Sequence, residues 1–320
     1  MATYLVTGGA GFIGSHLVEA LLAAGHRVRV LDDLSTGKRE NLPRGVTLLQ
    51  GDVADAGLVR RAMDGVAGCF HLAAIASVQR SNEDWTGTHR TNLAGTVAVL
   101  DAARGCGRVP VVYASSAAIY GDPRVTPIAE TTAPAPLTAY GADKLGSELH
   151  ARVAWLVHGV PTLGCRFFNV YGPRQDPRSP YSGVISIFAA RVAASEAVTV
   201  NGDGGQSRDF VYVGDVVRHL IAGMALLHRA PQAEIVNVCT GRATTLLQLI
   251  DTLEALCGLR AERRFGPPRT GDIRVSLGEP ARAEALLGLR AQVTLDQGLA
   301  LTLAPPGRRA RLLSSIVNER

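Results

Sequence analysis

Short apolar runs alternate with longer segments of helical periodicity over the first half of the chain. The apolar runs predict strands at residues 4–6, 28–31, 46–49, 69–72, 109–114 and 163–167. Between them, apolar residues at helical spacing predict helices over residues 11–24, 58–63, 88–104 and 140–157. This alternation indicates a doubly wound α/β fold, in which helices cover both faces of a parallel sheet.

The pattern loosens after about residue 168. Glycine, proline and aspartate cluster at residues 172–183 and 201–209, and helices are expected near residues 184–194, 215–228 and 244–257. We therefore expect one domain over residues 1–168 and a second, smaller α/β domain over residues 169–320. The chain is expected to cross back to the first domain around residues 206–240, and residues 305–309 to end the second domain.

Composition narrows the class of protein. The 320 residues are 47% hydrophobic and 19% charged, which is the balance of a globular chain. Five scattered cysteines without a C-x-x-C pair argue against a disulfide framework or a metal site and fit a cytoplasmic protein. No apolar run approaches the roughly 18 residues of a membrane span, and no basic region at the N-terminus suggests a secretory signal.

The net charge of +5 is compatible with several partners. Nucleic-acid binding usually combines a basic patch with aromatic residues on which bases stack. Here the arginines are dispersed and only 5% of residues are aromatic. We therefore expect no nucleic-acid partner and no membrane partner, and a basic balance suits an anionic small-molecule substrate.

A glycine-rich segment, TGGAGFIG at residues 7–14, joins the first predicted strand to the first predicted helix. Its spaced glycines allow a tight turn and close backbone approach to a pyrophosphate at the helix N-terminus. Asp32 ends the next strand, 18 residues after Gly14, where a carboxylate binds ribose hydroxyls and repels a 2′-phosphate. The segment predicts dinucleotide binding with NAD favoured over NADP, although Lys38 and Arg39 nearby leave that preference open.

Candidate catalytic groups follow two later strands, at the edge of the sheet where ligands bind in such folds. Ser115 and Ser116 follow the strand at residues 109–114, and Tyr140 and Lys144 share one face of a helix. A free tyrosine has a pKa of about 10 and is a poor base at neutral pH. A fixed ammonium and a positive nicotinamide ring would favour the phenolate, and a serine would orient the substrate hydroxyl.

Seven segments resemble the extended short-chain dehydrogenase/reductases, and in particular their NAD-dependent nucleotide-sugar epimerase/dehydratase group. They are TGGAGFIGS (7–15), GDV (51–53), HLAA (71–74), YASSAAIYGD (113–122), YGADK (140–144), RFFNVYGPR (166–174) and NGDGGQSRDFVYVGDV (201–216). They span most of the chain, and within the group it is most similar to UDP-sugar 4-epimerases. The resemblance implies an NAD-binding Rossmann domain followed by a nucleotide-sugar-binding domain.

The resemblance implies a hydride shuttle. Tyr140 takes the proton of the sugar 4-hydroxyl, C4 gives hydride to bound NAD, and hydride returns to the other face of the 4-keto sugar. Ser116, four residues before Tyr120, matches the catalytic serine, and Lys144 completes the set. Alanines at 117 and 118 replace the Asp-Glu pair of the dehydratases and argue against dehydration. Asp143 stands where the family often has a small residue.

The motifs and the resemblance together predict two sets of binding residues. The cofactor contacts are Gly8, Gly11, Phe12, Ile13, Gly14, Asp32, Asp33, Leu34, Ser35, Asp52, Val53, Leu72, Ala73, Ala74, Asn92, Ser115, Tyr140, Lys144 and Phe167. The substrate contacts are Ser77, Ser116, Asn169, Val184, Thr199, Asn201, Arg208, Phe210, Arg269, Asp272 and Ser276.

Ser276 guides the expected substrate, because by resemblance it borders the pocket for the sugar 2-substituent. A small residue there favours UDP-N-acetylglucosamine and UDP-N-acetylgalactosamine, with UDP-glucose and UDP-galactose as further candidates. A decarboxylase or net oxidoreductase on the same scaffold, and an NAD-binding protein without turnover, stay open as alternatives. The SRDF sequence at residues 207–210 resembles the epimerases, and the intact catalytic set argues against a silent protein.

A homodimer is the expected assembly. The predicted helices at residues 88–104 and 140–157 carry more apolar surface than one sheet face can cover. The residues concerned are Leu93, Val97, Val99, Leu100, Leu145, Leu149, Val153, Trp155 and Leu156. Pairing both helices across a two-fold axis gives a four-helix interface, which the resemblance also implies.

Overall fold

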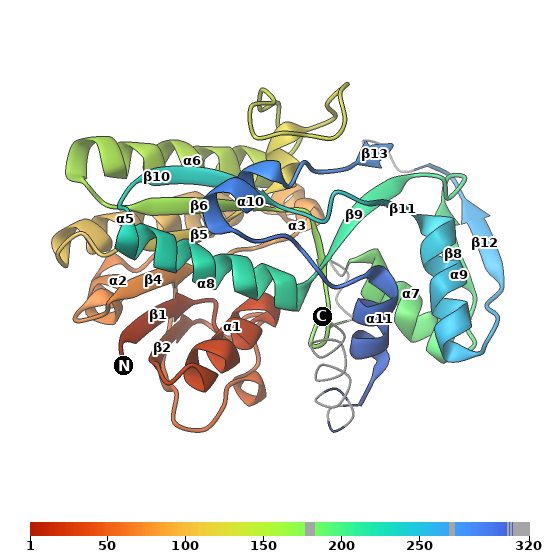
Figure 1. The fold of residues 1–320 in the computed structure, drawn as a ribbon, viewed down its shortest axis with the longest axis horizontal. Coiled ribbons are helices and arrows are strands. Elements are labelled where there is room, and N and C mark those ends of the chain that lie inside the picture. The colour runs from red at the N-terminus through yellow and green to blue at the C-terminus, as the bar shows by residue number, and fades with distance from the viewer. Residues whose placement is uncertain (177–182, 269–272, 306, 308, 310–320) are drawn as a thin grey trace.

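The computed structural model describes residues 1–176, 183–268, 273–305, 307 and 309. A seven-stranded, all-parallel sheet forms the larger of two lobes, with the strand order β10-β6-β5-β4-β1-β2-β3 (Figure 1). The strands are β1 (Thr3–Thr7), β2 (Arg27–Asp32), β3 (Thr47–Gln50), β4 (Gly68–His71), β5 (Val111–Ser116), β6 (Thr162–Phe167) and β10 (Ala233–Val238). The predicted doubly wound α/β fold is confirmed.

Helices cover both faces of this sheet. One face packs against α1 (Phe12–Ala23) and α8 (Val213–Arg229), and the other against α2 (Ala56–Met63), α5 (Gly95–Gly105) and α6 (Ala139–His158). The alternation of side chains in β1 explains the two cores. Tyr4 and Val6 pack with Leu17 of α1, whereas Leu5 packs with Val99 of α5 on the opposite face.

Several boundaries differ from the sequence prediction. β5 extends to Ser116, so both candidate serines are the last residues of a strand and do not follow it. The helix predicted at residues 88–104 is three consecutive elements, α4 (Trp85–His89), a π-helical turn (Arg90–Ala94) and α5. The elements that the pattern did not predict in the larger lobe are the edge strand β10, the helices α3 (Val78–Glu83) and α10 (Ala281–Leu287), and the short 3-10 helices η1 (Arg39–Asn41) and η3 (Ala117–Tyr120).

The smaller lobe is built around β9 (Ser207–Tyr212). This strand pairs with β7 (Asn169–Tyr171), β11 (Ala243–Thr245) and β13 (Val275–Ser276), while β8 (Val198–Asn201) pairs with β12 (Arg263–Gly266). Helices α7 (Val184–Ala193), α9 (Leu246–Cys257) and α11 (Leu295–Leu303) pack on these strands around a third apolar core.

The chain passes between the lobes more than once. After β9 it returns to the large sheet, where α8 packs against α1 and β10 pairs with β6 (Figure 1). The division at residue 168 stays a prediction. The predicted tail at residues 305–309 lies partly outside the described residues.

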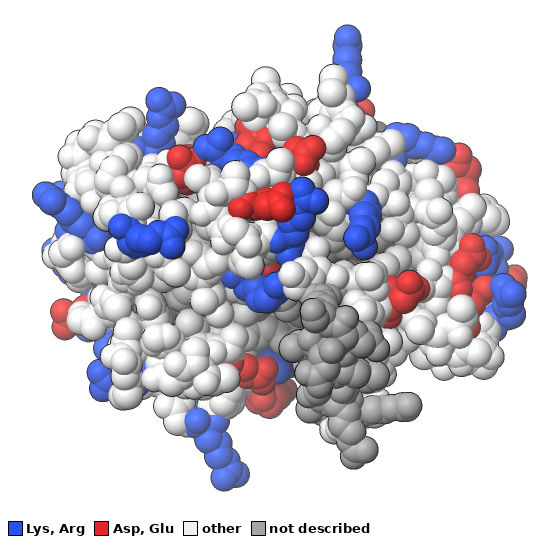
Figure 2. Space-filling view, in the orientation of Figure 1, with Lys and Arg blue, Asp and Glu red and all other residues white. Residues whose placement is uncertain are grey.

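Charged side chains of both signs are dispersed over the face of the molecule in Figure 2. On the face in Figure 2, Lys and Arg side chains lie among Asp and Glu side chains over both lobes. Within the described part of the chain, no helix is long and apolar enough to cross a bilayer. The cytoplasmic location stays a prediction.

Candidate active site

The conformation of the glycine loop between β1 and α1 is possible only because Gly8 and Gly14 have no side chain. Gly8 has a φ of +69°, and a Cβ there would lie 2.7 Å from the backbone N of Ala73. A Cβ on Gly14 would lie 2.1 Å from the carbonyl oxygen of Gly8. The first turn of α1 therefore packs directly on the loop, and its N-terminal N–H groups face the carboxyl edge of the sheet.

Asp32 stabilises this loop from the end of β2. Its Oδ2 accepts a hydrogen bond from the Ala10 N–H at 2.9 Å, and its Oδ1 accepts one from the Leu34 N–H at 2.9 Å. Burial raises the pKa of Asp32, and the two amide hydrogen bonds oppose that shift. Each carboxylate oxygen retains a second acceptor position, so the same side chain can also accept a hydroxyl.

The catalytic candidates meet where β5 ends against α6. Ser116, the last residue of β5, lies close enough to the Tyr140 side chain, in the first turn of α6, to lower the pKa of its phenol. Lys144 lies one turn further along, where its Nζ donates to the Ala114 carbonyl at 2.9 Å and lies 5.8 Å from the centre of the Tyr140 ring. The structure thus brings all three predicted catalytic residues together, and their roles stay predictions.

Burial controls the protonation of this group. It raises the pKa of Tyr140, and the hydrogen bond from Ser116 only partly offsets that effect. It also lowers the pKa of Lys144 to about 8. In the protein without a cofactor, the cost of burying a phenolate is the largest influence on the Tyr140 pKa. The expectation that the ammonium and the nicotinamide ring together lower this pKa stays a prediction.

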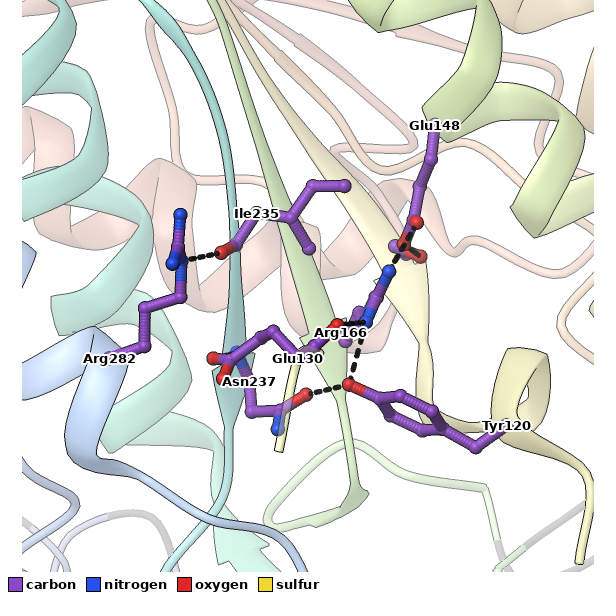
Figure 3. A network of polar contacts seen from close by, with 8 residues as sticks. Tyr120, Glu130, Glu148, Arg166, Ile235, Asn237 and Arg282 are labelled. Carbon is purple, nitrogen blue, oxygen red and sulfur yellow. Dashed lines mark hydrogen bonds and ion pairs between the residues drawn. The ribbon is translucent and has the colours of Figure 1, made fainter. Parts of the chain in front are cut away.

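A buried polar network, drawn in Figure 3, reaches α6 through Glu148. Arg166 of β6 donates to both carboxylate oxygens of Glu148, at 2.9 and 2.7 Å, and to the Tyr120 hydroxyl at 2.7 Å. Glu148, one turn after Lys144, also accepts from Ser115 Oγ at 2.5 Å. The network therefore fixes β5, β6 and α6 relative to one another.

Comparison with known proteins agrees with this geometry. Residues 4–239 match the NAD dependent epimerase/dehydratase family. The chain belongs to this family. A UDP-glucose 4-epimerase of Mycolicibacterium smegmatis is 38% identical over 93% of this chain and 96% of its own length.

Solved structures of the epimerase/dehydratase family are similar along almost the whole chain. A UDP-glucose 4-epimerase of Thermotoga maritima with UDP-glucose has a TM-score of 0.90 at 37% identity, covering 98% of this chain and 99% of its own. A UDP-N-acetylglucosamine 4-epimerase of Methanobrevibacter ruminantium, in complex with UDP-N-acetylmuramic acid, has a TM-score of 0.89 at 30% identity. It covers 94% of this chain and 97% of its own.

NAD, the cofactor of the epimerase/dehydratase family, fits the residues at this edge of the sheet. The absence of a Cβ at Gly8 and Gly14 lets the loop pack closely on Ala73 and on the first turn of α1, which is the arrangement that brings backbone N–H groups to a pyrophosphate. The predicted contacts that the structure places in the same loops are Gly11, Phe12 and Ile13 at the start of α1, Asp33, Leu34 and Ser35 after β2, and Leu72, Ala73 and Ala74 after β4. Phe167 ends β6.

Some predicted cofactor contacts already have partners in the protein. Asp52 pairs with Arg90 at 2.9 Å, and Val53 is buried. Asn92 is buried in the π-helical turn and bonds the backbone N–H and carbonyl of Ile75, so it holds the loop after β4. Ser115 points to Glu148, whereas its neighbour Ser116 points to Tyr140.

The predicted substrate contacts fall into three groups. Asn169 pairs with Phe210, and Ser276 with Arg208, in the sheet around β9. Those outside this sheet are Ser116 at the end of β5, Ser77, which caps α3, Val184 at the start of α7, and Thr199 and Asn201 on β8. Arg269 and Asp272 lie outside the described residues.

The side chains of Phe210 and Arg208, two further predicted substrate contacts, also have partners within the protein. The Phe210 ring is buried in the core of the smaller lobe, edge-on to Tyr171. Arg208 Nη1 donates to the Ile273 carbonyl at 2.7 Å. Within the described residues, no group of His, Cys, Asp and Glu side chains could hold a metal ion.

Sequence reasoning missed the residues that support the site. His71 at the end of β4 lies between Thr7 Oγ1 at 2.8 Å and Thr96 Oγ1 at 3.0 Å, and burial and Lys144 lower its pKa to about 3. Thr96 donates its one proton to Asn92, so His71 Nε2 must be the donor to Thr96 and Nδ1 the acceptor from Thr7. In the sequence, only the HLAA motif at residues 71–74 drew attention to this histidine, and the cofactor contacts predicted from that motif were the three residues after His71.

Proposed function

We propose that the chain is a UDP-sugar 4-epimerase, which inverts C4 of a UDP-hexose or UDP-N-acetylhexosamine by transient oxidation. The observation that carries this proposal is the contact of Ser116, Tyr140 and Lys144 beside the glycine loop. The names of the relatives, which are UDP-glucose and UDP-N-acetylglucosamine 4-epimerases, support the same reaction.

The residues of the chain divide the chemistry between them. NAD, when bound, supplies the hydride acceptor. Tyr140 removes the proton of the 4-hydroxyl, and Ser116 holds that hydroxyl and the phenol in one hydrogen-bonded line. Lys144 keeps a positive charge near the phenolate as it forms, which stabilises it in a water-poor site. Ala117 and Ala118 offer no acid or base, so the sugar retains its 6-hydroxyl.

The experiment is an assay of purified protein, with no NAD added, against UDP-glucose, UDP-galactose, UDP-N-acetylglucosamine and UDP-N-acetylgalactosamine. An epimerase regenerates its cofactor in each cycle, so the 4-epimer of the added sugar is expected without exchange of NAD. UDP-glucuronate serves as the test for decarboxylation. If none of the four hexoses yields its epimer, the proposed function is wrong.

The sugar preference has its own prediction. Ser276 is half-buried on β13 beside Arg208, and a small side chain there leaves space for an acetamido group. Ser276→Tyr is expected to reduce kcat/KM for the N-acetylated sugars roughly 5- to 150-fold, because overpacking costs about 1–3 kcal/mol. The plain sugars should change little, so the measured quantity is the ratio of the two activities. Equal losses for both would show that Ser276 does not border the pocket.

We also propose a two-fold homodimer through α5 and α6. Leu149, Val153 and Leu156 of α6 and Val97 of α5 are exposed, with Leu156 67% exposed. The prediction that Val99 and Leu100 belong to this surface is wrong, because both are buried against the sheet. A second copy of the chain is the occupant, since two-fold pairing covers the same apolar row on both partners.

Light scattering tests the dimer. The wild type is expected at twice the 33.7 kDa of one chain, and Val153→Glu/Leu156→Glu at the monomer mass, because two carboxylates would be buried unpaired in each copy. Phe265→Glu, an exposed apolar residue of β12, is the matched control and should stay dimeric. A wild-type mass of one chain would contradict the proposal.

A further inference from the structure

Two carboxylates flank Lys144 on its own helix, and they differ in how their charge is balanced. Glu148 is paired with a buried guanidinium, Arg166, through two hydrogen bonds and also accepts from Ser115. Asp143, the residue before Lys144, is 3% exposed and faces α4. The contact that the structure gives its side chain is from His89, at 2.8 Å between Nδ1 and Oδ1.

The second oxygen of Asp143 is the unusual feature. Its Oδ2 is buried and has no hydrogen-bond partner. Leaving a buried charged oxygen unpaired is costly, so a position that retains one requires an explanation. His89 is half-exposed and offers a single ring nitrogen, so it balances Asp143 less fully than Arg166 balances Glu148.

The nearest consequence is for Lys144. Lys144 is 3% exposed, and burial favours the neutral amine. Burial lowers its pKa, two carboxylates, Asp143 and then Glu148, raise it, and the pKa that results is about 8. From β4, His71 faces the same amine but stays neutral, because its pKa is about 3.

We propose that Asp143 is a positioning residue whose unbalanced negative charge keeps Lys144 protonated, and that His89 holds the carboxylate in place for this purpose. The proposal deepens the proposed function, on which its kinetic consequence rests. Without Asp143, the balanced pair of Glu148 and Arg166 would supply little net charge, and the amine would lose its proton nearer neutral pH.

The composition of the chain makes a direct test simple. Lysine occurs only at positions 38 and 144, so protein labelled with ¹³C-lysine gives two side-chain NMR signals. Lys38 is a surface residue paired with Asp176, and Lys38→Arg removes its signal while keeping its charge. The remaining signal reports the protonation of Lys144 across a pH titration of the purified protein.

Asp143→Asn is expected to move the titration midpoint of Lys144 to lower pH by on the order of one unit. Asp143→Glu, which keeps the charge, should restore most of the shift. Asp251 on α9 forms an exposed ion pair with Arg263. Asp251→Asn removes the same charge from the protein and should leave the midpoint of Lys144 unchanged. An unchanged midpoint in Asp143→Asn, with the fold intact by circular dichroism, would overturn the proposal. If the asparagine variant does not fold, Asp143→Ala and Asp143→Ser are titrated in its place.

A kinetic measurement separates this proposal from the proposed function. In an active epimerase, the fall of kcat at alkaline pH should begin at lower pH in Asp143→Asn, because the ammonium is lost earlier. At pH 6 the variant and the wild type should be much closer in kcat. Wild-type protein without epimerase activity would contradict the proposed function, while the NMR titration would still decide the role of Asp143.

Discussion

Tyr140→Phe is expected to reduce kcat for epimerisation by roughly 10²- to 10⁴-fold, the usual contribution of a positioned general base. The variant loses the hydroxyl that contacts Ser116 but keeps the ring beside Lys144. Binding of NAD and of the UDP-sugar should therefore stay near the wild-type level. The measurements are steady-state kinetics, the NAD content of the purified protein, and calorimetric titration with UDP.

A matched control exists in the same lobe. Tyr113 of β5 is buried near Gly164 of β6 and belongs to no predicted contact set, so Tyr113→Phe removes a phenol oxygen without touching the catalytic group. It should retain kcat within a few fold. If Tyr140→Phe retained a rate near that of the wild type, Tyr140 would not be the base.

The pH dependence of the wild type follows from the same group. Lys144 stabilises the phenolate only while it is protonated, and its pKa of about 8 means that the charge is lost as the pH rises above that value. The Tyr140 phenol has its pKa raised by burial, so its deprotonation depends on positive charge near the ring. These two requirements restrict turnover to a window, with its alkaline side set by Lys144.

Six of the seven strands of the large sheet could be predicted because each is a local apolar run, as at residues 28–31 and 163–167. The seventh strand, β10, was not predicted. The smaller lobe could not be predicted to the same degree. β11 has three residues and β13 only two, which is too short for any periodicity to be seen. Their place is set by pairing with β9, a contact between segments far apart in the sequence.

The active site also has parts that the sequence predicts and parts that it does not. The spacing of Tyr140 and Lys144 is local, so one helix turn suffices to predict that they share a face. The supporting network is not local, since Tyr120 bonds Asn237 and Arg166 bonds Glu148 from different strands and helices. A sequence shows each of these residues only as a polar residue in an apolar segment, and the pairing appears when the sheet is assembled.

The two serines at the end of β5 illustrate both cases, a local feature that the sequence predicts and a distant contact that it does not. The resemblance favoured Ser116 over Ser115, and the alternation of side chains in a strand means that only one of two neighbours can face Tyr140. In the structure that neighbour is Ser116, while Ser115 is buried and donates to Glu148. The partner of Ser115 could not be foreseen, because Glu148 lies 33 residues away in sequence.

Arg166→Met is expected to lower the free energy of unfolding by about 3–5 kcal/mol, the usual cost of breaking a buried ion pair by removing one partner. Arg166 and Glu148 are each only 4% exposed, so the carboxylate of Glu148 would be left buried without its two strongest donors. Tyr120 and the Glu130 carbonyl would also lose the guanidinium that donates to them. Urea denaturation measures the loss.

The origin of this effect is tested by a second substitution and by a control. Arg166→Met/Glu148→Gln removes the stranded charge and keeps an acceptor for Ser115, so it should be more stable than Arg166→Met alone. Arg282 makes a more exposed contact at the edge of the same sheet, with Glu234 and with the Ile235 carbonyl, and the second of these bonds is visible in Figure 3. Arg282→Met should cost less than about 1 kcal/mol. A double variant no more stable than Arg166→Met would mean that lost packing around the guanidinium, rather than the uncompensated carboxylate, carries the penalty. The arginine would then act on the site through the position of β6 alone.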